Sequence, residues 1–206
     1  MRRERQTLWR CKLCGWANAE DANKCISCGK QKKRAKKAAL PRSREAARCI
    51  VLALDTANTS GWAVWICGQL HNHGQHALYS DAGIAKTQTL MRELQSLSTI
   101  TGLPIACMSE RSWGGHMDRG DTKAFGYWVY ALRCIGVSIK RILQVYPSQW
   151  RAVVLSGGVG LKRDAVRALE LECARSIVGT EVGDDEAAAI CIGVYAAHCG
   201  ELVASL

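Results

Sequence analysis

Residues 50–61 read Ile-Val-Leu-Ala-Leu-Asp-Thr-Ala-Asn-Thr-Ser-Gly, and this stretch decides the fold. The apolar run 50–54 contains β-branched residues and is too short for a helix, so it predicts a buried strand. The small and polar residues after Asp55 predict a turn. The strand therefore carries a carboxylate at its own end.

The rest of the chain predicts a mixed five-stranded sheet flanked by helices, an α/β fold. His71-Asn72-His73-Gly74 is interpreted as a hairpin turn between the second and third strands, rather than as a histidine metal site. The further strands are expected at 61–67, 75–82, 104–109 and 141–145, and the helices at 86–100, 122–137, 162–178 and 184–203.

Two acids follow directly on apolar strands, Asp55 after the first and Glu110 after the fourth. A third acidic group, Asp184-Asp185-Glu186, opens the last predicted helix. Carboxylates at the ends of buried strands lose hydration and repel one another, and a divalent cation removes that cost. Oxygen ligands of this kind suit Mg²⁺ or Mn²⁺. Taken singly, Asp55 could be a turn residue and Asp184 a helix N-cap.

The charge of this 206-residue chain is concentrated at one end. Residues 1–48 hold 15 Lys and Arg against 4 Asp and Glu, whereas residues 49–206 hold 13 against 14. A local cationic segment favours nucleic acid as a partner through counterion release; an acidic membrane or protein surface and a solubility tail are the alternatives. No apolar run is long enough to span a membrane and no signal peptide is present, so we expect a chain that is neither secreted nor membrane-inserted.

Four cysteines form two CxxC pairs, Cys11 with Cys14 and Cys25 with Cys28, separated by ten residues. This spacing predicts one structural Zn²⁺ with four thiolate ligands and no open position for catalysis. A disulfide pair is the alternative, but the odd total of 11 cysteines and the missing signal peptide favour a reducing compartment. The remaining cysteines are interpreted as small core residues.

With Trp9 and Asn18, these cysteines resemble the Ran-binding-protein-type zinc finger, W-x-C-xx-C-xxx-N-x6-C-xx-C. The resemblance implies a small binding module without naming its ligand, which stays open between DNA, RNA and protein. We predict a finger at 1–30, a flexible basic linker at 31–48 and the main domain at 49–206. The basic residues expected to follow a nucleic-acid backbone are Lys30, Lys32, Lys33, Arg34, Lys36 and Lys37.

The main domain resembles the RuvC family of Holliday-junction resolvases, within the RNase H-like superfamily. The resemblance covers residues 49–203 and rests on five pieces in order: Leu52-Ala53-Leu54-Asp55, Gly61-Trp62-Ala63, Ser109-Glu110-Arg111, Tyr146-Pro147-Ser148-Gln149-Trp150-Arg151 with Lys162 beyond a glycine-rich loop, and Asp184-Asp185-Glu186-Ala187-Ala188-Ala189. It implies a homodimer that binds a four-way DNA junction and makes paired nicks with two metal ions. It also implies a location in the cytoplasm of a bacterium or of a phage-infected host cell.

The resemblance assigns the metal ligands to Asp55, Glu110 and Asp185, and it places a fourth acid where this chain has Ala188. The chain either works with three carboxylates or is a variant inactivated by alanine at position 188, natural or engineered. Lys162 is expected near a phosphate, the alternative being an ordinary solvent-exposed lysine.

Trp113 follows Glu110 in the loop Ser112-Trp113-Gly114-Gly115-His116, where the resemblance implies an aromatic wedge in the junction centre. A buried core tryptophan is the alternative, and Arg111 is a further candidate for DNA contact. Two other functions stay open: an RNase H-like nuclease acting on other branched DNA or on RNA:DNA hybrids, and a nucleic-acid-binding protein without nuclease activity.

Overall fold

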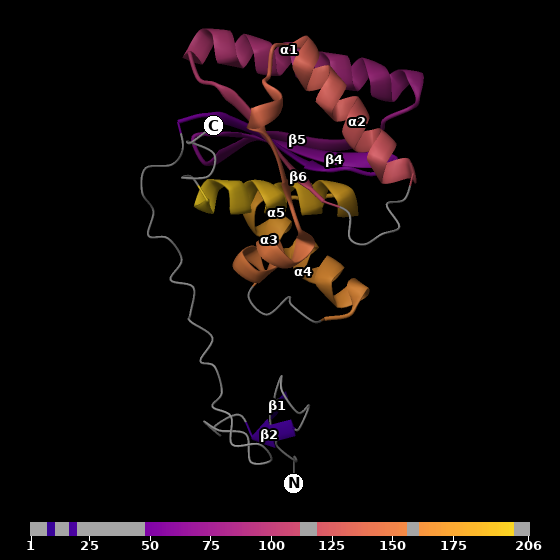
Figure 1. The fold of residues 1–206 in the computed structure, drawn as a ribbon, viewed down its shortest axis with the longest axis vertical. Coiled ribbons are helices and arrows are strands. Elements are labelled where there is room, and N and C mark those ends of the chain that lie inside the picture. The colour runs from indigo at the N-terminus through magenta and orange to yellow at the C-terminus, as the bar shows by residue number, and fades with distance from the viewer. Residues whose placement is uncertain (1–7, 11–16, 20–47, 112–118, 156–160, 200–206) are drawn as a thin grey trace. The chain divides into compact units, whose positions relative to one another are not determined.

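The computed structural model describes residues 8–10, 17–19, 48–111, 119–155 and 161–199 (Figure 1). The chain divides into two compact units, residues 1–39 and 40–206. In the first unit β1 (Leu8–Arg10) pairs antiparallel with β2 (Ala17–Ala19), opposing Trp9 to Asn18. The four cysteines predicted to bind zinc, the basic residues 30–37 and Trp113 lie outside the described residues, so their roles stay predictions, as does the division into three segments.

The second unit is built on a mixed sheet of five strands in the order β5-β4-β3-β6-β7. The central strand β3 pairs antiparallel with β4 and parallel with β6, and β6 pairs parallel with β7. The strand bounds are β3 Ile50–Asp55, β4 Thr59–Ile66, β5 Gln69–Ala77, β6 Ile105–Glu110 and β7 Ile142–Val145. The predicted fold class is confirmed.

Helices cover both faces of this sheet (Figure 1). One face carries α1 (Asp81–Thr101) and α2 (Arg119–Cys134), and the other carries α3 (Pro147–Val154), α4 (Arg163–Val178) and α5 (Asp184–His198). A short 3₁₀ helix, Ile139–Arg141, precedes β7. None of the described helices is long and apolar enough to cross a membrane.

Alternation along β3 divides the interior into two cores. Leu52 and Leu54 pack into the core shared with α1 and α2, whereas Val51 and Ala53 pack into the core shared with α3, α4 and α5. Because β3 is buried on both faces, its sequence is a continuous apolar run rather than an alternating one.

The predicted hairpin turn at 71–74 is wrong, because β5 runs through it. The chain turns instead at Cys67 and Gly68, whose φ angles of 49° and 80° are both positive. Gly74 belongs to the strand for a packing reason: a Cβ there would lie 2.8 Å from Cζ2 of Trp62 on β4. The strand predicted at 75–82 therefore starts earlier, and it gives way to α1, whose N-cap Ser80 accepts a hydrogen bond from the Gly83 amide.

Candidate active site

Asp55 and Glu110 lie side by side because β3 and β6 are parallel neighbours. Their register pairs Leu54 with Ser109, so the next residue of each strand is an acid at the same edge of the sheet. The two carboxylates, which were predicted separately at the ends of two strands, therefore lie next to each other.

Asp185 joins them through a close approach between α5 and β4. Gly61 is the residue opposite Asp55 in the antiparallel pair, and a Cβ on Gly61 would lie 1.8 Å from the Asp185 carbonyl oxygen. Only glycine leaves room for the first turn of α5 at this position. The helix therefore begins directly beside the end of β3.

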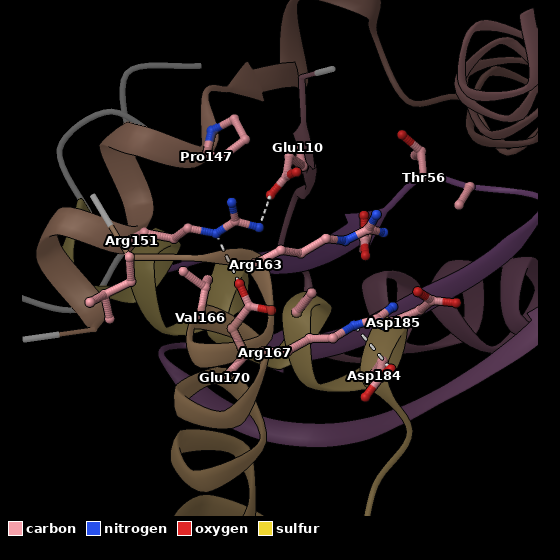
Figure 2. A pocket seen from close by; sticks show the side chains of 14 residues that line it. Thr56, Glu110, Pro147, Arg151, Arg163, Val166, Arg167, Glu170, Asp184 and Asp185 are labelled. Carbon is pink, nitrogen blue, oxygen red and sulfur yellow. Dashed lines mark hydrogen bonds and ion pairs between the residues drawn. The ribbon is translucent and has the colours of Figure 1, made fainter. Parts of the chain in front are cut away.

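The three acids line one pocket of about 700 Å³. Figure 2 labels two of them, Glu110 and Asp185. The pocket also contains Asp184 and Glu170, and three cations that sequence reasoning missed. These cations are Arg151 from α3 and Arg163 and Arg167 from α4. The site therefore combines a cluster of carboxylates with a guanidinium-lined wall.

Burial and like charge strongly disfavour the ionised form of Asp55. Loss of hydration raises the pKa of Asp55 well above its ordinary value; the negative charges of Glu110, Asp185 and Glu170 raise it further, and Arg151 lowers it. Burial also raises the pKa of Asp185, an effect opposed by Arg167 and reinforced by Asp184. Additional positive charge in the pocket would stabilise both carboxylates.

Glu110 is held by two residues of α3. The Trp150 indole Nε1 donates a hydrogen bond of 2.8 Å to Oε2 of Glu110, and an Arg151 terminal nitrogen lies 3.6 Å from the same oxygen. Trp150 is fully buried, so the carboxylate is fixed from the core side.

Ala188 lies in the lining of the same pocket and is only 5% exposed. It follows Asp185 by three residues on α5, almost one helical turn, so the two residues share a helix face. A carboxylate at position 188 would therefore project toward Asp55 and Asp185.

The donor set fits a hard divalent cation, because all the candidate ligands are carboxylate oxygens. Across the part of the chain that the structure describes, no three His, Cys, Asp or Glu side chains are grouped tightly enough to hold an ion by themselves. Mg²⁺ tolerates such an arrangement, since it keeps several waters and commonly binds one or two carboxylates together with substrate phosphate. The ligand roles of Asp55, Glu110 and Asp185 stay predictions.

Two other predicted contacts lie outside the pocket lining. Lys162 is the exposed N-cap residue of α4, beside the pocket residues Leu161 and Arg163. Arg111 places its guanidinium 5.0 Å from the centre of the Tyr146 ring. Nothing in the structure tests either residue against DNA.

Two of the three missed cations, Arg163 and Arg167, carried a readable signal. Arg163, Arg167 and Glu170 are spaced i, i+4 and i+7 within the predicted helix 162–178, which puts them on one face. That face lines the pocket.

Comparison with solved structures shows a fold similar to that of RuvC. Thermus thermophilus RuvC in complex with Holliday junction substrate matches with a TM-score of 0.51 and 15% identity, over 76% of this chain and 97% of that chain. A second Thermus thermophilus RuvC structure matches with a TM-score of 0.51 and 16% identity, over 74% and 95%. The yeast mitochondrial Holliday junction resolvase gives a TM-score of 0.40 and 15% identity, over 78% and 82%. No protein-family model and no curated protein sequence matches the chain.

Proposed function

We propose that this chain is a structure-selective DNA endonuclease that resolves four-way junctions with bound Mg²⁺ or Mn²⁺. The observation that carries the proposal is the convergence of Asp55, Glu110 and Asp185, from β3, β6 and α5, in one pocket. The shared fold with RuvC, one structure of which contains Holliday junction substrate, supports the choice of DNA.

Each side chain has a defined task in this proposal. Asp55, Glu110 and Asp185 would hold the divalent ions. When bound, such ions supply an activated water and stabilise the charge on the leaving oxygen during phosphodiester hydrolysis. The guanidinium groups of the pocket would bind and orient the phosphodiester, because they are permanently charged and match phosphate oxygens in geometry.

The remaining parts of the proposal concern assembly and affinity. Two paired nicks require two sites, which a homodimer with two-fold symmetry provides. The basic segment 30–37 would add affinity for the arms of the branched DNA through phosphate contacts. The finger, with Zn²⁺ on Cys11, Cys14, Cys25 and Cys28, would contribute a second contact to DNA, RNA or protein.

A second candidate is a nucleic-acid-binding protein that has lost cleavage. The observation that favours it is Ala188, which lines the pocket at a position from which a fourth carboxylate would face Asp185.

Cleavage by the parent protein and by Ala188→Asp, with Mg²⁺, separates these functions. Four-way junction, linear duplex and RNA:DNA hybrid are offered to each protein. Symmetric nicks in the junction alone support the proposal; cleavage of the hybrid or the duplex instead assigns a different substrate. Ala85→Asp on α1 is the matched control, because it adds the same charge at an exposed position on the opposite face of the sheet.

The two proteins are expected to differ in rate rather than in binding. If position 188 has lost a ligand, Ala188→Asp gains about 10-fold or more in cleavage rate while the control stays at the parent rate. Junction binding without cleavage by both proteins supports the second candidate. Failure of both proteins to bind any of the three substrates refutes the two functions together.

A further inference from the structure

Glu170 is a buried acid for which the proposed metal chemistry has no use. It lies on α4, is 4% exposed, and lines the same pocket as Asp55 and Glu110. A buried carboxylate is costly unless it is paired and hydrogen-bonded. A short apolar residue would fill this place on α4 without that cost, so the retained charge requires an explanation.

The partner of Glu170 is Arg151, which reaches it from α3. Nε of Arg151 donates a hydrogen bond of 2.9 Å to Oε1 of Glu170, and a terminal nitrogen of the same guanidinium lies 3.6 Å from Glu110. Figure 2 shows the guanidinium between the two carboxylates, with a dashed line to each. One arginine therefore links an acid of β6 to an acid of α4.

The orientation of Arg151 is fixed more by Glu170 than by Glu110. The contact to Glu170 is shorter, and the Glu170 side chain is 6% exposed against 19% for Glu110. The Arg151 guanidinium also lies 4.9 Å from the centre of the Trp150 ring. The hydrogen bond to Glu170 and the contact with this ring therefore both constrain the orientation of the guanidinium. Arg151 also lines the pocket, so the remaining N–H groups of this planar guanidinium are available to a phosphate bound there.

We propose that Glu170 is a positioning residue that holds Arg151 beside Glu110, so that the guanidinium faces the phosphate to be cut. This inference rests on the proposed nuclease function, and it adds a residue of α4 to that site. Glu170 acts through Arg151 and does not itself touch the substrate.

The direct readout of this role is the order of the Arg151 side chain. In the free, zinc-loaded full chain, the Nε–Hε NMR correlation of Arg151, assigned by its loss in Arg151→Lys, is expected to be sharp and slow to exchange. Glu170→Gln keeps the size of the side chain and removes its charge, and it is expected to broaden this signal or make it exchange rapidly. An unchanged signal overturns the proposal whether or not the protein is a nuclease.

The second readout is junction cleavage, in the parent or in Ala188→Asp, whichever cuts. Glu170→Gln is expected to lower kcat about 10–100-fold with KM nearly unchanged, as for other groups that orient an active-site side chain. Adding Glu170→Gln to Arg151→Lys is expected to cause no further loss of kcat, because Glu170 acts only through Arg151, which is already replaced. Further loss in the double variant, or a change in KM alone, contradicts the proposal.

Controls separate positioning from folding and from failure of the proposed function. Glu172→Gln removes an exposed charge two residues along α4 and is expected to change neither readout. Glu170→Asp keeps the charge on a shorter side chain and is expected to recover part of the lost rate. If the parent neither binds nor cuts junction, the nuclease function fails, while the NMR signal still decides whether Glu170 holds Arg151.

Discussion

Gly61→Ala tests the contact that brings Asp185 to the end of β3. The new Cβ would lie 1.8 Å from the Asp185 carbonyl oxygen and 2.1 Å from its carbonyl carbon, whereas real Cβ contacts stay above 3.0 Å. The first turn of α5 must therefore retreat by roughly 1.2 Å, the difference between these two distances. Both clashing atoms belong to the backbone, so no side-chain rotation relieves the overlap.

We expect Gly61→Ala to lose about 1–3 kcal/mol of unfolding free energy through overpacking. For a chain of this size, that loss lowers Tm by roughly 2–12 °C in thermal denaturation followed by circular dichroism. A displacement near 1 Å at a reacting group can cost about 100-fold in rate, so any metal-dependent cleavage should fall by more than stability alone explains.

The matched control is Gly126→Ala in α2. Nothing lies within 4 Å of a Cβ at this position, so alanine is expected to raise stability by about 0.5–1 kcal/mol through helix propensity. A Gly61→Ala protein as stable and as active as the parent would show that α5 does not approach β4 as described.

Three further expectations follow from the same pocket and from the charged N-terminal segment. Asp55→Asn should stabilise the metal-free protein by about 0.5–2 kcal/mol at pH 7. Because the pKa of Asp55 is raised in the folded state, its contribution to the stability of the parent is fully present below its unfolded-state pKa and is lost as the pH rises through its folded-state pKa. Urea titrations should show the gain disappearing below about pH 4, and a less stable variant at pH 7 would be contrary to this reasoning. Trp150→Phe should cost about 1.5–3 kcal/mol in urea denaturation by removing the 2.8 Å bond to Glu110, and a loss under about 0.5 kcal/mol would show that this bond contributes little. Removal of residues 1–48 should flatten the fall of junction affinity with rising salt, and an unchanged slope would place the phosphate contacts elsewhere.

The sheet could be predicted because each of its inner strands has a local pattern. The run 50–54 and the single acid after it, Asp55, specify a buried strand and its end without reference to other segments. The β4–β5 turn could not be predicted, because Cys67-Gly68 is an unusual hairpin pair while Asn72 and Gly74 resemble turn residues. Gly74 is explained by the Trp62 indole, which is a contact between strands and leaves no local signal.

The acids at the strand ends and at the start of α5 could be predicted, whereas Glu170 and the cations of the pocket could not. Asp55 and Glu110 follow strands directly, so topology alone puts them at one sheet edge. Arg151 and Glu170 are 19 positions apart in the sequence and meet because α3 and α4 both pack against α5, a pairing that no spacing rule contains. Arg163 and Arg167 shared a helix face, but the sequence did not show which way that face points.

Isothermal titration of the full chain with Mn²⁺ tests the shared carboxylate site most directly, through Asp55 and Glu110. We expect binding by the parent, its loss in Asp55→Asn and in Glu110→Gln, and unaltered binding in Glu172→Gln. Equal Mn²⁺ affinity in the parent and in both pocket variants would contradict a shared carboxylate site.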